Sequence, residues 1–168
     1  NVAPILMDIT VDGTEIKAVV QLTKQAIAYT FNRVTGEPIW PIVERPVLGS
    51  NTPGEWISPT QPFPSKPLPF DRHGVTDDDL IDFTPELRAE AVEILKPYIL
   101  GPIFTPPSIR SDDPENTKGT FQLPGSVGGA EWGGAGFDPE TGMLYIPSVT
   151  AGFVADLTPG NPDRMNVR

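Results

Sequence analysis

Three side chains in this sequence combine a reactive group with an unusual setting. Lys24 follows a candidate strand, and its ammonium can donate three hydrogen bonds to the oxygens of a ligand. Glu131 and Trp132 stand between glycine pairs, where a carboxylate can bond a ligand while an indole stacks on its face. These residue types suit a planar, oxygen-rich molecule. Two alternatives stay open: Lys24 is a solvated surface residue, and Trp132 fills a core gap beside a tight turn.

Other candidate residues carry weaker signals. His73 is the one His of the chain, so a general-base role stays open, but a polar loop residue is the favoured interpretation. Residues 77–79 are all Asp, yet they lack the spacing and the glycine of an EF-hand, and helix capping explains them better. Residues 125–136 are rich in Gly but lack the Lys-Ser/Thr ending of a P-loop. Neither a metal nor a phosphate site is indicated by these segments.

Composition excludes several classes of function. The 168 residues carry a net charge of −10, and no cluster of Lys and Arg is present to bind a phosphate backbone, so no nucleic-acid partner is expected. The chain has no Cys and therefore no disulfide or thiolate nucleophile. No stretch approaches the roughly 18–20 apolar residues that cross a bilayer. The chain opens on Asn1 and closes on Arg168 without a signal-peptide pattern, and we expect both ends to interrupt a longer polypeptide; a mature N-terminus left by processing is the alternative.

Antiparallel hairpins are the elements that must position the candidate residues. Strands are predicted over 2–9 and 15–22, joined by Asp12 and Gly13, a pair that tolerates the positive φ of a tight turn. A third strand is predicted over 26–31, followed by a turn at 32–36 and a partner at 37–40. Lys24 would lie in the connection between the second and third strands.

The turn after the third strand has a second copy later in the chain. Phe31, Thr35 and Gly36 match residues 137, 141 and 142, each 106 positions later. The second copy again places an aromatic residue, an Asx residue and Thr-Gly between two strand candidates. Two copies of one turn suggest repeated antiparallel units, although a pattern this short can also recur by chance.

The segment between the two copies differs from them. Residues 41–70 hold eight prolines, which remove backbone donors and exclude a central strand or a helix. We expect an extended excursion along the surface, packed through Trp56, Phe63 and Phe70. An amphipathic helix is predicted from Thr84, the N-cap, and Pro85 up to Pro97. Residues 101–124 are predicted to be loop.

Seven short motifs occur in one order along residues 2–148. They are TKQ at 23–25, FNRVTG at 31–36, SPTQPF at 58–63, FTPPS at 104–108, LPG at 123–125, EWGG at 131–134 and FDP at 137–139. Together they resemble the dehydrogenases that depend on pyrroloquinoline quinone (PQQ), and among these the membrane-associated glucose and polyol dehydrogenase type. Each motif alone is weak, and the ordered set carries the resemblance.

The resemblance implies an all-β fold, a partial eight-bladed β-propeller of the quinoprotein type. Residues 1–168 would form two or three blades, with a Pro-rich and helical insertion at about 41–120, and the remaining blades would be partners in the parent protein. PQQ would lie across the propeller axis against a calcium ion. The family's calcium ligands and catalytic Asp are expected upstream of Asn1, so this chain holds no catalytic and no metal-binding residue.

The resemblance also implies roles for three residues as cofactor-binding groups. Lys24 is similar to the family's basic side chain that bonds the quinone oxygens and stabilises the charge developing there. Glu131 and Trp132 resemble the pair that lines the cofactor chamber. Alcohol-oxidising relatives tend to carry Asn-Trp instead, so Glu131 favours the sugar and polyol branch.

The function implied is oxidation of an aldose such as glucose, or of a polyol, with electrons passed to ubiquinone or a cytochrome c in the periplasm. Membrane association would come through another part of the parent, and the isolated chain is expected to lack activity. The alternative is a non-catalytic β-propeller that serves as a binding scaffold, because blade turns alone do not imply chemistry. An unrelated Pro-rich binding module is the least favoured alternative. If Lys24 and Trp132 share a cleft, the enzyme is favoured; on opposite surfaces, the scaffold is.

Overall fold

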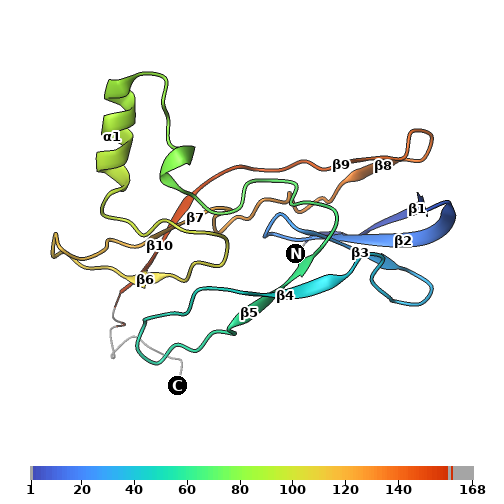
Figure 1. The fold of residues 1–168 in the computed structure, drawn as a ribbon, viewed down its shortest axis with the longest axis horizontal. Coiled ribbons are helices and arrows are strands. Elements are labelled where there is room, and N and C mark those ends of the chain that lie inside the picture. The colour runs from blue at the N-terminus through green and yellow to red at the C-terminus, as the bar shows by residue number, and fades with distance from the viewer. Residues whose placement is uncertain (1, 159, 161–168) are drawn as a thin grey trace.

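The computed structural model describes residues 2–158 and 160 of the chain, so the expectation about Asn1 and Arg168 lies outside the described residues. Short strands dominate it, together with one α-helix and a 3-10 turn. Figure 1 shows a three-stranded sheet at one end and the helix at the other, with long irregular segments between them. Within the described part of the chain, no helix has the length and apolarity that crossing a bilayer requires.

The N-terminal sheet confirms the predicted hairpin. Strands β1 (Ile5–Val11), β2 (Thr14–Leu22) and β3 (Ala28–Asn32) are antiparallel in the order β1-β2-β3. Asp12 and Gly13 take φ values of 50° and 79°, the left-handed geometry that the tight turn requires. Both strands extend closer to the turn than predicted, because β1 ends at Val11 and β2 begins at Thr14.

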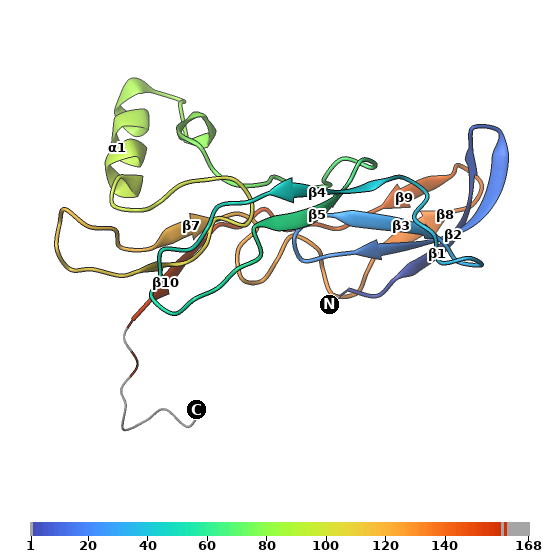
Figure 2. The ribbon, with the colours of Figure 1, turned by 60° about the horizontal axis from the view of Figure 1, so that its bottom comes forward.

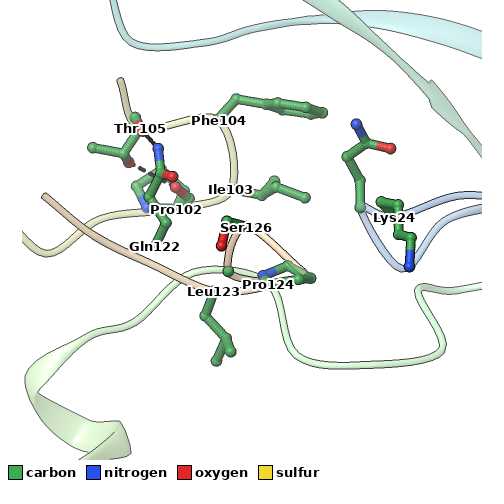
Figure 3. Close-up of a pocket in the computed structure, with 11 residues that line it drawn as sticks. Lys24, Pro102, Ile103, Phe104, Thr105, Gln122, Leu123, Pro124 and Ser126 are labelled. Atoms are coloured by element: carbon green, nitrogen blue, oxygen red, sulfur yellow. Dashed lines mark hydrogen bonds between the residues drawn. The ribbon is translucent and has the colours of Figure 1, made fainter. Parts of the chain in front are cut away.

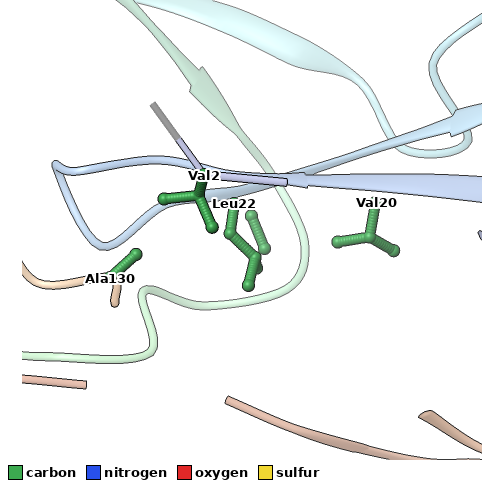
Figure 4. Close-up of a cluster of buried hydrophobic side chains, with 5 residues drawn as sticks. Val2, Val20, Leu22 and Ala130 are labelled. Carbon is green, nitrogen blue, oxygen red and sulfur yellow. The ribbon is translucent and has the colours of Figure 1, made fainter. Parts of the chain in front are cut away.

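One face of the sheet forms the core. Alternate residues of β2 are buried, as expected for a strand with one face packed. The cluster shown in Figure 4 also includes a residue from the glycine-rich segment, more than a hundred positions away. Its members are Val2, Val20, Leu22, Ala28 and Ala130. The same apolar contacts that hold the sheet therefore hold the glycine-rich segment beside it.

The repeated turn has the same geometry in both copies. The side chains of Asn32 and Asp138 each accept from the backbone amide two residues on, at 2.9 Å. The amides of Gly36 and Gly142 close the turns onto the carbonyls of Asn32 and Asp138, at 2.8 and 2.9 Å, and both glycines have positive φ. The second turn joins β8 (Gly136–Asp138) to β9 (Met143–Tyr145), as predicted.

The first copy lacks a full partner strand, and here the prediction was wrong. After the turn, residues 37–40 contribute an isolated bridge between Phe31 and Pro38 rather than a strand. The pairing is limited to this bridge and the two backbone bonds that flank it, from the amide of Asn32 to the carbonyl of Glu37 at 2.8 Å and from the amide of Ile39 to the carbonyl of Thr30 at 2.9 Å.

The Pro-rich segment is extended and lies outside the central sheet, as expected. It contains a two-stranded antiparallel ribbon of β4 (Ile42–Pro46) and β5 (Thr60–Pro64), seen beside the three-stranded sheet in Figure 2. Phe63 packs edge-on against Phe104, with ring centroids 5.7 Å apart, and Phe70 packs on the core. The expectation for Trp56 was wrong: this side chain lies on the loop between the two strands and is 83% exposed.

The predicted helix is present as α1 (Pro85–Leu95). The hydroxyl of Thr84 accepts from the amide of Leu87 at 3.2 Å, which confirms the N-cap. None of the helix residues is buried, and even Ile94 on its apolar face is 59% exposed. The stability of α1 therefore rests on its cap and backbone bonds more than on packing.

Residues 101–124 are not entirely loop, so that prediction was wrong in part. Strands β6 (Ser108–Ile109) and β7 (Thr120–Gln122) flank β10 (Phe153–Leu157), parallel and antiparallel to it respectively. Strands of two or three residues have no readable period, and their shared partner lies 48 residues beyond β6 and 31 to 35 residues beyond β7. Only the tertiary fold brings the three segments together.

Candidate functional site

Lys24 lies in a tight turn between β2 and β3. The amide of Ala26 donates to the carbonyl of Thr23 at 3.0 Å, and the amide of Thr23 donates to the carbonyl of Ile27 at 2.9 Å. Ala26 has φ of 59°, a left-handed conformation that costs a residue with a Cβ roughly 1–2 kcal/mol. The turn is therefore a strained element that its surroundings must hold in place.

The glycine-rich segment holds this turn directly. Nζ of Lys24 donates to the carbonyl of Ala130 at 2.8 Å, and the amide of Gly129 donates to the carbonyl of Lys24 at 2.8 Å. The two backbones approach closely, because a Cβ on Gly128 would lie 2.9 Å from Cα of Lys24. A Cβ on Gly129 would lie 2.8 Å from Cβ of Ala26. Glycine at these two positions is what allows the contact.

The other two predicted site residues follow Ala130 in the same segment. Glu131 is partly buried, and its Oε2 accepts from the amide of Gly133 at 2.7 Å. Trp132 is 75% exposed, so the alternative in which it fills a core gap is wrong. The structure thus brings Lys24 to the backbone that carries Glu131 and Trp132, and it leaves the indole free to contact another molecule or another part of a larger protein.

A cavity of about 250 Å³ adjoins the Lys24 turn. In Figure 3, Lys24 lies across it from Pro102 and Thr105. Its lining combines an apolar wall with a few amide and hydroxyl groups: Lys24, Gln25, Pro102, Ile103, Phe104, Thr105, Gln122, Leu123, Pro124, Gly125 and Ser126. Glu131 and Trp132 are not part of this lining, so the predicted residues do not all share one hollow. A lining that is mainly apolar with a few polar groups is typical of small-molecule sites.

The wall opposite Lys24 is fixed by its own hydrogen bonds. The hydroxyl of Thr105 donates to the carbonyl of Pro102 at 2.6 Å, and Nε2 of Gln122 donates to the carbonyl of Thr105 at 2.8 Å. Phe104, which lies between Pro102 and Thr105 in the chain, has φ of 68°, a value that is rare for an aromatic residue. Phe104 and Thr105 belong to the FTPPS motif, which supported the family resemblance but was not predicted to line the site. The aromatic residue beside two prolines was the available signal.

His73 lies behind the Lys24 turn, a position that the sequence did not reveal. Its Nε2 is 2.6 Å from the carbonyl of Gln25, which can only accept, so the imidazole donates. Burial lowers the pKa of His73 below its ordinary value and outweighs the bond to Gln25 and the charge of Asp71, which both raise it. The predicted polar loop residue is confirmed, and it has a specific partner.

The acidic run caps a turn, as predicted. Oδ2 of Asp79 accepts from the amide and the hydroxyl of Thr76 at 2.8 and 2.9 Å, and Arg72 pairs with the same carboxylate. These hydrogen bonds lower the pKa of Asp79. Across residues 2–158 and 160, no three His, Cys, Asp or Glu side chains gather in a way that could hold a metal ion. The expectation that calcium ligands lie upstream stays a prediction.

Curated relatives match most of this chain. Quinoprotein glucose dehydrogenase A of Acinetobacter calcoaceticus is 34% identical over 158 residues, which is 90% of this chain and 18% of that protein. The glycerol dehydrogenase large subunit of Gluconobacter thailandicus is 32% identical, covering 79% of this chain and 17% of that protein. The quinate/shikimate dehydrogenase (quinone) of Acinetobacter baylyi is 28% identical, covering 98% and 20%.

The chain thus spans about a fifth of the length of these relatives. No solved structure matches it significantly. The PQQ family model, described as glucose/ethanol/alcohol dehydrogenase, beta-propeller domain, matches residues 1–167. The chain therefore belongs to the PQQ-dependent, or quinoprotein, dehydrogenase family and to its β-propeller domain.

Proposed function

We propose that this chain forms one wall of the cofactor chamber of a PQQ-dependent dehydrogenase that oxidises an aldose or a polyol. The observation that carries the proposal is the bond of Lys24 to Ala130, which brings an ammonium to the backbone of the segment that carries Glu131 and Trp132. Relatives named for glucose, glycerol and quinate oxidation support a substrate with several hydroxyl groups. Family membership implies PQQ as the cofactor and, typically, calcium.

The residues present fit a quinone ligand. Lys24 uses one of its three ammonium hydrogens on Ala130, and the other two remain for carbonyl or carboxylate oxygens of a ligand. Trp132 offers an exposed indole face, and aromatic faces stack on planar rings. The close approach of Gly128 and Gly129 holds the turn that carries Lys24, and the bond to Ala130 fixes the ammonium, as a preorganised donor requires.

The chain's residues would bind and orient, and the cofactor would accept the hydride or electrons from the substrate. Lys24 would donate hydrogen bonds to an oxygen that becomes more negative during reduction, which lowers the barrier because the donor is already in position. The carboxylate of Glu131 holds the amide of Gly133 and so shapes the loop that carries the indole. The general base would come from outside this chain.

The proposal extends to the parent protein. Eight blades would close the propeller, and the other blades would pack against the exposed apolar faces of this chain. Electrons would pass to ubiquinone or a cytochrome c in the periplasm, with any membrane anchor in another part of the protein. The cavity that Lys24 lines does not include Trp132, so the shared-cleft criterion does not favour the enzyme over a non-catalytic scaffold. The relatives named as glucose and glycerol dehydrogenases support the enzyme.

The test uses the full polypeptide that carries this chain, reconstituted with PQQ and Ca²⁺ and assayed by dye reduction with glucose, glycerol and quinate. Lys24→Ala should lower kcat by about 10²–10³, the effect of removing one preorganised donor. The loss of folding stability should be small, since the side chain makes a single bond to Ala130.

Lys96→Ala is the matched control, because Lys96 is an exposed lysine whose ion pair with Glu93 is 3.5 Å long. It should leave kcat unchanged. A wild-type protein that takes up no PQQ and reduces no dye with any polyol would refute the proposed function. Equal turnover in wild type and Lys24→Ala would show that Lys24 has no role in the proposed function.

A further inference from the structure

The turn that carries Lys24 is anchored at every carbonyl. The carbonyl of Thr23 accepts from Ala26 at 3.0 Å, that of Lys24 from Gly129 at 2.8 Å, and that of Ala26 from the amide of Phe70 at 3.1 Å. The fourth, that of Gln25, accepts from His73 at 2.6 Å. Consecutive carbonyls with separate partners leave the turn little freedom to rotate its peptide planes.

Three of these four donors are backbone amides, and the fourth is a side chain. His73 is therefore the one anchor among the four that a substitution can remove without altering the main chain. Its bond joins residues 48 positions apart and reaches the carbonyl directly after Lys24. The left-handed φ of Ala26 means that the turn stores strain, which the anchors must oppose.

The segment that follows His73 is fixed to the cavity wall. The amide of Gly74 donates to the carbonyl of Leu123 at 2.7 Å, and the amide of Val75 donates to the carbonyl of Gly101 at 3.0 Å. A Cβ on Gly74 would lie 2.6 Å from Cα of Pro102. The imidazole thus extends from a rigid strip of backbone that also supports the wall opposite Lys24.

We infer that His73 is a positioning residue for Lys24: its Nε2–H holds the Gln25 carbonyl and thereby fixes the turn from which the ammonium reaches Ala130. The expected effect of His73 on kcat rests on the proposed function, but its effect on the position of Lys24 does not. A neutral imidazole suffices for the donation, and burial, by lowering the pKa of His73, keeps the ring neutral near pH 7.

The first experiment measures the position of Lys24 without any cofactor. The apo full polypeptide is treated with acetic anhydride, and the acetylation rates of Lys24 and of the exposed Lys96 are compared by mass spectrometry. In His73→Ala the ratio of Lys24 to Lys96 labelling should rise severalfold, because the ammonium leaves Ala130 more often. In His73→Gln it should stay near the wild-type ratio, since the amide can still donate to the Gln25 carbonyl.

The matched control is Tyr29→Phe. Tyr29 also makes one side-chain bond to a backbone carbonyl, that of Pro62 at 2.8 Å, on the neighbouring strand but outside the turn. This variant should lose stability comparably and leave Lys24 labelling unchanged. If His73→Ala labels Lys24 no faster than Tyr29→Phe does, the inference is overturned, whatever the protein's activity.

The second experiment uses the PQQ- and Ca²⁺-loaded protein. His73→Ala should lower kcat about tenfold with little change in the KM for the dye, and His73→Gln should restore most of it. In the Lys24→Ala background His73→Ala should have no further effect on kcat, because the group through which it acts is gone. Equal loss in both backgrounds would overturn the inference. Absent turnover in wild type would overturn the proposed function instead, and the labelling result would still decide the role of His73.

Discussion

At the scale of single residues, the candidate site depends on how closely two backbones approach. Lys24 and Gly128 belong to segments about a hundred positions apart, yet a single Cβ on Gly128 would come within 2.6 Å of Cβ of Lys24. Contacts this short leave no room for relaxation by a flexible side chain. The position of the ammonium therefore depends on glycine at position 128 as well as on the bond to Ala130.

Substitutions of two glycines can distinguish the effect of the contact with Lys24 from the effect of backbone strain. Gly128 and Gly142 have φ of 81° and 70°, but an added Cβ on Gly142 meets nothing within 4 Å. Alanine at Gly142 should cost roughly 1–2 kcal/mol of stability through its φ alone, and alanine at Gly128 should cost more, because its Cβ also clashes with Lys24. Only Gly128→Ala should also weaken PQQ binding, by on the order of tenfold or more, because it displaces Lys24. Titration of PQQ into both variants of the full polypeptide measures this, and equal affinities would contradict the expected placement.

His73 predicts a pH dependence of stability. Because its folded pKa is lowered, the unfolded chain binds more protons as the pH falls below the ordinary histidine value of about 6.5. The stability associated with the neutral ring is thus present above that pH and is lost below it. Urea unfolding of the full polypeptide should show a smaller loss between about pH 7 and pH 5 for His73→Gln than for wild type.

The carboxylates provide the internal control for that comparison. Asp79 and Asp138 also have lowered pKa values, through hydrogen bonds from Thr76 and Thr141 respectively. Their stabilisation is lost at lower pH, near and below the ordinary carboxylate range, and equally in both proteins. Identical pH profiles for wild type and His73→Gln would show that the imidazole is not held neutral by burial.

At the scale of elements, α1 shows how a local signal can specify a helix without a core. Thr84 caps it, Pro85 begins it, and none of its residues is buried. An exposed helix of 11 residues is marginal on its own propensity. The cap therefore contributes a large share of its local stability.

Thr84→Ala should cost about 1 kcal/mol of local helix stability, the usual effect of losing an N-cap. Because α1 packs little, hydrogen exchange in residues 85–95 should accelerate about fivefold, while the global unfolding temperature changes little. Thr84→Ser keeps the acceptor and should match wild type. A large fall in the unfolding temperature would mean that α1 is packed against another part of the parent protein.

At the scale of the whole molecule, this chain buries little apolar surface. In the described residues an apolar hollow of about 240 Å³ lies beside the core, lined by Met7, Ile9, Val20, Ala28, Thr30, Trp40, Pro67, Leu68, Phe70, Leu144 and Ile146. Leu68 and Phe83 are both more than 80% exposed. In a closed propeller, neighbouring blades would cover such surfaces.

The chain produced by itself should therefore bind an apolar dye such as ANS strongly and show no PQQ-dependent turnover. The full polypeptide at the same molar concentration should bind much less dye and be active. The fluorescence of added ANS and the dye-reduction assay together measure this. Weak ANS binding and a cooperative unfolding transition in the chain alone would show that its apolar faces do not need further blades.

Local sequence determined much of this protein. The Asp12–Gly13 hairpin, the two Asx turns 106 residues apart and the Thr84 cap depend on residues within a few positions of one another, so their side chains and φ preferences specify them directly. The ordered motifs also identified the family. The short strands β6 and β7 could not be predicted, because two or three residues show no hydrophobic period.

The site itself was decided by the tertiary structure. Sequence suggested Lys24, Glu131 and Trp132 as candidates, but not the bond from Lys24 to Ala130 or the one from His73 to Gln25. These bonds join residues 106 and 48 positions apart, and nothing in the local pattern encodes a partner at such a distance. Only when the core packs Ala130 against β2 and β3 do the glycine-rich segment and the turn meet, and only then does the ammonium have a fixed place.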